Sequence, residues 1–116
     1  MAADLPPQLQ NQLAQLQQLQ QQASVIVNQR QQLELAVREL ERTIEELAKA
    51  EPDATIYRSV GGLLIRAKDK AVVTKELTDT KETTEVRLES VKRQEQRLRE
   101  RLESLQKELQ AALGGR

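Results

Sequence analysis

The sequence predicts a mainly α fold, in which two long helices form an antiparallel coiled-coil hairpin and one small β-hairpin is inserted between them. Charged residues make up 31% of the 116 residues, and Tyr57 is the only aromatic residue. This composition is typical of long helices and coiled coils. Apolar residues follow a period of about 3.5 on both sides of the middle, and a short stretch rich in β-formers separates the two periodic segments.

The first helix is expected over residues 7–51, within a single domain of residues 1–116. Pro7 suits the first helical position, where its missing N–H costs no hydrogen bond. Pro52 disfavours the helical conformation for Glu51 before it. One unbroken heptad register runs through the segment and predicts a coiled-coil seam. Its positions are Leu9, Gln12, Leu16, Leu19, Ala23, Ile26, Arg30, Leu33, Val37, Leu40, Ile44 and Leu47.

A β-hairpin is expected over residues 54–67, which read ATIYRSVGGLLIRA. Two apolar runs flank Gly61-Gly62, a pair that favours a two-residue primed turn. Pairing across this turn places Val60 opposite Leu63 and leaves apolar side chains on both faces. A lone two-stranded hairpin is marginal in water. We therefore expect these strands to pair with other subunits rather than to fold back on the helix ends.

The second helix is expected over residues 71–113, because glycine at 114 and 115 favours termination. The short connection makes the two helices pack antiparallel. Two alignments fit the seams equally, one with Leu16 against Leu105 and one, a heptad away, with Leu16 against Ala112. The seam of the second helix is Leu77, Lys81, Thr84, Leu88, Val91, Glu95, Leu98, Leu102, Leu105, Leu109 and Ala112.

Arg30 and Glu95 interrupt the two apolar seams. They are either tolerated polar residues whose heads reach water along their stems or partners in an ion pair across the seam. In both alignments they lie one layer apart, which favours the ion pair. Its expected use is to specify the register rather than to add stability, because polar seam residues cost stability.

Residues 5–29 carry no charged side chain, and twelve of them carry a side-chain amide. Residues 92–116, which antiparallel packing places alongside, contain seven Lys or Arg and four Glu. The uncharged tract is either a low-complexity helix with a solvated face or a surface of leucines and amides that contacts many partners without charge selectivity. Composition alone slightly favours the solvated face.

The missing residue types exclude several classes of function. The chain has no His and no Cys, so it offers neither a zinc site of the usual kind nor a thiol nucleophile. No phosphate-binding glycine motif is present, and no cofactor or metal is expected. Carboxylates alone can serve a glycosidase, but two helices enclose no pocket. We therefore expect a binding or assembly protein and not an enzyme.

A signal peptide, a membrane-spanning segment and general binding of nucleic acid are not expected either. The N-terminal residues lack the basic and apolar regions of a signal peptide. No apolar stretch is long enough to span a membrane. The net charge of zero argues against general binding of nucleic acid.

With this layout, the chain resembles the β-class subunits of archaeal prefoldin. The resemblance covers essentially the whole chain, and its most specific pieces are QLAQLQQLQQQ at 12–22, IYRSVGGLLIR at 56–66 and VKRQEQRLRERLESLQKELQ at 91–110. A chain with a single hairpin resembles the β class, whereas α-class subunits have a similar plan with two hairpins. Gly61-Gly62 before leucine departs from the Gly-Asn or Gly-Pro that relatives often carry, which leaves the turn type open.

The resemblance implies a subunit of an ATP-independent molecular chaperone. It implies a cytoplasmic hexamer of two α-class and four β-class subunits that joins through its hairpins, binds unfolded client proteins at the coiled-coil tips and passes them to a group II chaperonin. An oligomeric coiled-coil scaffold or tether without client-holding activity is the alternative. The residues expected to drive assembly are Ile56, Tyr57, Val60, Leu63, Leu64 and Ile65. The residues expected to hold clients, at the end where both termini meet and the seam loses its neighbours, are Leu5, Leu9, Leu13, Leu16, Leu109 and Leu113.

Overall fold

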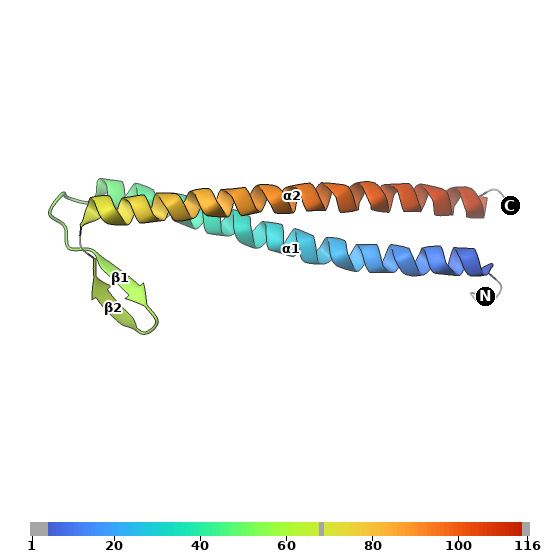
Figure 1. Ribbon diagram of the computed structural model, residues 1–116, viewed down its shortest axis with the longest axis horizontal. Coiled ribbons are helices and arrows are strands. Elements are labelled where there is room, and N and C mark those ends of the chain that lie inside the picture. Colours follow the sequence, from blue (N-terminus) through green and yellow to red (C-terminus); the bar gives the residue numbers. More distant parts are fainter. Residues whose placement is uncertain (1–4, 68, 115–116) are drawn as a thin grey trace. The chain divides into compact units, whose positions relative to one another are not determined.

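The structure is a computed structural model that describes residues 5–67 and 69–114. In chain order, the elements are α1 (Pro7–Lys49), β1 (Tyr57–Val60), β2 (Leu63–Arg66) and α2 (Lys70–Gly114) (Figure 1). The predicted fold class is confirmed, since two long helices flank one small antiparallel β-hairpin. Gly115 and both ends of the predicted domain 1–116 lie outside the described residues.

The first helix, α1, begins at Pro7 and ends at Lys49, before the predicted end at Glu51. The amide of Ala50 donates to the carbonyl of Leu47 at 3.2 Å. This contact between residues three apart tightens the last turn and uses one of the carbonyls that a helix end leaves without a partner.

Lys70, the first residue of α2, caps the same end of α1. Its Nζ donates to the carbonyls of Ala48 at 3.1 Å and Ala50 at 2.8 Å. A cation at a helix C-terminus is favourable, because the last carbonyls carry partial negative charge. This cap accounts for a helix end upstream of Pro52.

The second helix, α2, begins at Lys70 rather than at residue 71, because Asp69 is its N-cap. The Oδ1 atom of Asp69 accepts from the amide of Val72 at 2.8 Å, and its carbonyl accepts from the amide of Val73 at 3.2 Å. Asp is among the preferred N-cap residues. The helix ends at Gly114 rather than at residue 113.

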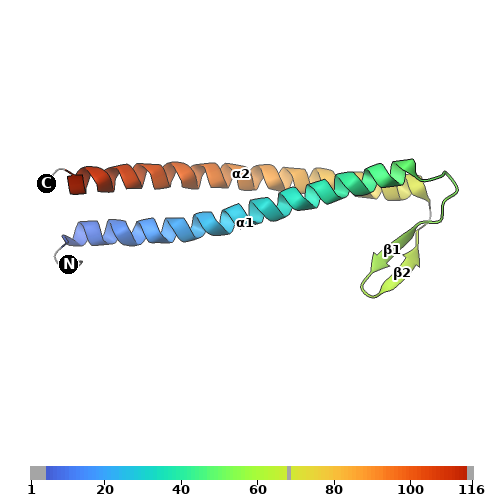
Figure 2. The same cartoon turned by 180° about the vertical axis from the view of Figure 1, so that it is seen from behind.

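The described chain falls into two compact units. We call residues 5–31 and 89–114 the end unit, and residues 32–88 the hairpin unit. In the end unit, the first turns of α1 pack against the last turns of α2, which makes the helices antiparallel (Figure 2). The core of this unit is formed by Leu9, Leu19, Leu105 and Leu109.

In the hairpin unit, Val37 and Leu88 are the buried apolar residues of the helix pair. Lys81 occupies a predicted seam position and is half-buried. Its Nζ lies 3.9 Å from Oε1 of Glu41 on α1, so the stem covers apolar surface while the charged head reaches the rim.

The predicted heptad seams match the observed burial. Every predicted seam residue of α1 is buried or half-buried, and in α2 only Ala112 is exposed. The 3.5-residue period therefore identifies the packed face of both helices, including the polar positions Gln12, Arg30 and Glu95.

Candidate functional site

The β-hairpin has the register that the sequence predicts. Val60 lies opposite Leu63, and the pairing continues in step along both strands. Gly61 has a φ of 60°, whereas Gly62 lies outside the positive-φ region. The connection is therefore a type II′ turn, which requires a positive φ at its first central position and favours glycine there.

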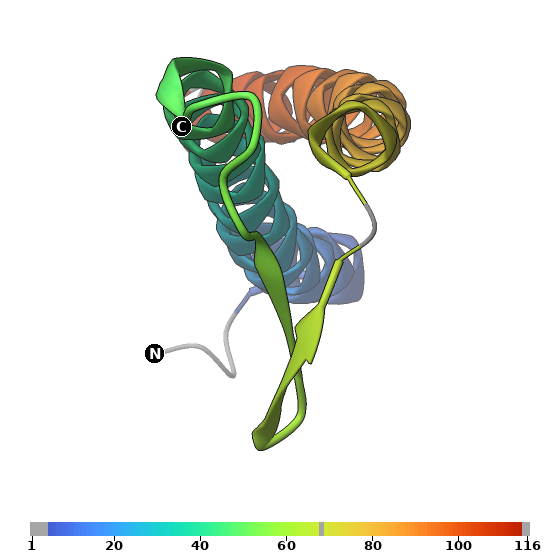
Figure 3. The same cartoon turned by 90° about the vertical axis from the view of Figure 1, so that its left-hand side faces the viewer.

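All eight strand residues are exposed to solvent. Among these strand residues, the most exposed apolar side chains are those of Leu64 (72%), Leu63 (68%) and Tyr57 (59%). Apolar groups lie on both faces, because successive residues of a strand point in opposite directions. Figure 3 shows the strands projecting away from the adjoining ends of the two helices. In the part of the chain that the structure describes, neither outer edge of the sheet has a partner strand. Such a surface is typical of strands that pair with another chain.

The base of the hairpin is tied to α2 by an ion pair. Nη2 of Arg58 on β1 pairs with Oε2 of Glu76. A cavity of about 370 Å³ lies beside this contact, and its apolar lining includes Leu47, Ile56 and Leu77. Sequence reasoning missed the ion pair, because opposite charges eighteen residues apart meet only once the path of the linker is known. The pair joins β1 to the first turns of α2.

The leucines predicted to hold clients differ widely in exposure. Leu9 and Leu109 are only 7% and 5% exposed, because they belong to the core of the end unit. The expectation that the terminal leucines stay uncovered is therefore wrong for these two. Leu113 is 47% exposed. The remaining predicted residues are half-buried and pack against the core: Leu5, Leu13 and Leu16.

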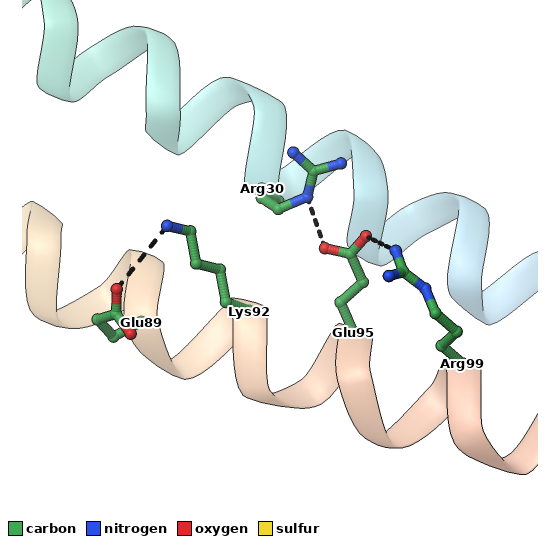
Figure 4. A network of polar contacts seen from close by, with 5 residues as sticks. All are labelled: Arg30, Glu89, Lys92, Glu95 and Arg99. Atoms are coloured by element: carbon green, nitrogen blue, oxygen red, sulfur yellow. Dashed lines mark hydrogen bonds and ion pairs between the residues drawn. The ribbon is translucent and has the colours of Figure 1, made fainter.

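Arg30 and Glu95 form an ion pair inside the end unit (Figure 4). Nε of Arg30 lies 2.5 Å from Oε1 of Glu95. The other carboxylate oxygen, Oε2, accepts a hydrogen bond from Arg99 at 3.0 Å. Sequence reasoning missed Arg99, although a spacing of four residues along a helix is the usual signal for such a contact. The Glu95 side chain is 11% exposed and that of Arg30 is 25% exposed, so both charges are largely withdrawn from water and need each other.

The described residues contain no group of acidic side chains that could hold a metal ion. Neither described helix has a segment long and apolar enough to cross a membrane. The candidate sites of the described chain are the exposed strand surface, the leucine cluster of the end unit and the ion pair of Arg30 with Glu95.

A family model described as prefoldin subunit matches residues 10–116. The chain belongs to the prefoldin subunit family. Among its relatives, prefoldin subunit beta of Archaeoglobus fulgidus is 46% identical over 110 residues, which cover 95% of this chain and 94% of the relative. Prefoldin subunit beta of Methanosarcina mazei is 47% identical over 116 residues, which cover 100% of this chain and 98% of the relative.

The fold agrees with a solved prefoldin structure. The crystal structure of the prefoldin beta subunit from Thermococcus strain KS-1 superimposes with a TM-score of 0.86 at 37% identity, over 95% of this chain and 96% of that one. The resemblance to β-class prefoldin subunits is confirmed. Prefoldin is a chaperone family and not a known enzyme family.

Proposed function

We propose that this prefoldin subunit holds unfolded proteins without ATP and hands them to a group II chaperonin in the cytosol. In this proposal, two α-class and four β-class subunits assemble through their hairpins, and clients bind at the end unit. The observation that carries the proposal is the hairpin of residues 57–66, whose strand residues are all exposed. A monomer would leave this apolar surface in water, and assembly would cover it.

The hairpin supports assembly through both its faces and its edges. Leu63 and Leu64 point to opposite faces and are the most exposed apolar residues of the two strands. Each edge also presents backbone N–H and C=O groups that a neighbouring strand can satisfy. The contact of Arg58 with Glu76 favours one orientation of β1 against α2, which reduces the ordering that assembly requires.

The end unit supports client binding through leucines that are only partly covered. Leu113 is exposed, and Leu5 and Leu13 are half-buried outside the seam. An unfolded client offers apolar side chains and unpaired amides, and the uncharged tract of α1 offers leucines and side-chain amides. Each contact is weak, and several subunits acting together supply the affinity. Weak single contacts also allow release.

The client site is tested with the assembled complex in an aggregation assay on a denatured model protein without ATP. Removing residues 1–12 and 109–116 would delete core residues, because Leu9 and Leu109 are buried. Replacement of Leu5, Leu13 and Leu113 by Ser leaves both buried leucines in place. This triple variant should protect the denatured protein from aggregation much less than the unmodified complex does. The matched control carries the exposed changes Leu35→Ser, Val72→Ser and Val86→Ser.

The outcomes separate the client site from the alternative function. Protection by the triple variant equal to that of the unmodified complex would exclude the chain ends as the client site. If neither the subunit alone nor its complex with an α-class partner protects the denatured protein from aggregation, the chain is a coiled-coil scaffold and not a holding chaperone.

The assembly surface is tested by Ile65→Asp, which places a charge on the exposed strand β2. We expect the helix content to persist while the complex separates into smaller species, measured by native mass determination. Val86→Asp is the control, because Val86 is 70% exposed on α2 and outside the hairpin. A hexamer of unchanged mass with Ile65→Asp would contradict the assignment.

A further inference from the structure

The end unit carries a groove that none of the proposed client or assembly residues lines. Its volume is about 690 Å³. Ile26 of α1 and Leu98 of α2 are half-buried residues of its lining, and Val25, also part of the lining, is 57% exposed. The groove therefore offers an apolar surface that the chain itself leaves in water.

The charge around this groove is of one sign. On the α2 side it is lined by Arg97 and Arg101, four residues apart and thus on the same flank of the helix. In the part of the chain that the structure describes, neither guanidinium has a hydrogen bond or an ion pair. Arg99, by contrast, is engaged by Glu95.

The α1 side of the groove adds no charge that could neutralise these arginines. Its polar lining consists of Gln18, Gln21 and Gln22, and no carboxylate lines the groove within the described residues. The acidic neighbour of Arg101 along the chain, Glu100, accepts a hydrogen bond from Gln96 at 3.1 Å. The groove is thus an apolar surface with two unpaired cations along one flank and uncharged amides along the other.

We propose that this groove binds an amphipathic helical segment of another protein that carries acidic side chains beside an apolar stripe. The apolar stripe would cover Val25, Ile26 and Leu98. Two carboxylates one helical turn apart have the same spacing as Arg97 and Arg101, and a guanidinium can bind a carboxylate with two hydrogen bonds. A helix laid into a groove is a common mode of peptide recognition. The site is separate from the proposed client residues and does not rest on them.

The probe is a pair of labelled helical peptides of about 20 residues, long enough to populate a helix. Both peptides have the same leucine stripe, and one carries Glu where the other carries Lys. Fluorescence anisotropy with the assembled complex measures their affinities. The acidic peptide should bind about tenfold more tightly or better, since two favourable contacts are exchanged for two repulsive ones. Its affinity should fall as salt is raised, because the contacts are at the surface.

Charge reversal in the groove should reverse this preference. Arg97→Glu with Arg101→Glu should favour the basic peptide. If this reversed variant folds poorly, Arg97→Gln with Arg101→Gln takes its place and should remove the preference. The control is Arg87→Glu with Lys107→Glu, which changes the net charge equally at exposed positions outside the groove. Circular dichroism checks that all variants keep their helix content.

Equal affinity of the two peptides for the unmodified complex would overturn the proposal. Loss of the acidic preference in the control variant would overturn it as well, because net charge and not the groove would then be responsible. The variant with Ser at Leu5, Leu13 and Leu113 should bind the acidic peptide normally. If that variant loses the peptide, the binding belongs to the chain ends and not to the groove.

Discussion

Reversing the charges of Arg30 and Glu95, separately and together, measures how strongly this ion pair couples the two helices of the end unit. In Arg30→Glu, two carboxylates face each other where N and O now lie 2.5 Å apart. Two unit charges about 4 Å apart interact by about 4 kcal/mol at an effective dielectric constant of about 20. The Arg30 side chain is 25% exposed, so part of this repulsion is relieved by movement toward water. We expect a loss of about 2 kcal/mol in the free energy of unfolding.

The second single variant, Glu95→Arg, should cost a similar amount, because the new arginine faces both Arg30 and Arg99. The double variant restores opposite charges across the seam. It leaves like charges at positions 95 and 99, and such a pair four residues apart costs only about 0.2–0.5 kcal/mol. The double variant should therefore lie within about 1 kcal/mol of the unmodified chain, which makes the coupling energy about 3 kcal/mol.

Urea unfolding followed by circular dichroism measures these free energies. The control cycle swaps Lys75 and Asp79, whose charged atoms lie 3.1 Å apart but whose side chains are 77% and 60% exposed. Exposed pairs of this kind couple by at most about 0.5 kcal/mol. If Arg30 and Glu95 couple no more strongly than this control, the reasoning from burial is refuted.

Three smaller changes test the hairpin and its connections. Gly61→Ala should destabilise the hairpin by about 1 kcal/mol, because a φ of 60° strains any residue with a Cβ even where space is open. Gly62→Ala should be neutral. Equal hydrogen exchange of the strand amides in the two variants would contradict the role of Gly61. Asp69→Ala should cost about 1 kcal/mol of stability in thermal denaturation, and Asp69→Ser should restore most of it if capping is the cause. Arg58→Ala should accelerate hydrogen exchange in the strands and not in the helices, since the half-exposed pair with Glu76 contributes less than about 1 kcal/mol; unchanged exchange in the strands would argue against its positioning role.

The sequence is sufficient to predict the features that depend on local period and turn chemistry. A 3.5-residue period identifies the packed faces of α1 and α2, since a residue of a helix can reach the partner helix only at seam positions. Gly61-Gly62 sets the strand register, because a two-residue turn leaves only one pairing of Val60 with Leu63. The meeting of Arg30 with Glu95 follows from their adjacency in either alignment.

The features that sequence reasoning misses depend on how segments meet in space. The cap of α1 by Lys70 joins residues twenty or more positions apart. The seam predicts that Leu9 and Leu109 face the partner helix, but not that they are buried so close to the chain ends. From the seam alone, the last leucines of a coiled coil are expected to lack covering residues beyond them. In the structure, Leu5 and Leu13 lie off the seam and pack against this core. The groove beside Arg97 is likewise set by which side chains flank the packed face, and the period does not report this.

The two open edges of the hairpin have a consequence for the symmetry of any assembly built on them. One edge belongs to β1 and the other to β2, so pairing β1 of one copy with β2 of the next uses two different surfaces. Such a contact is heterologous, and it closes into a ring only if the rotation from copy to copy divides a full turn. The twist between neighbouring strands therefore decides how many copies fit, independently of the length of the coiled coil. Where that rotation does not close, the same contact leads to an open filament.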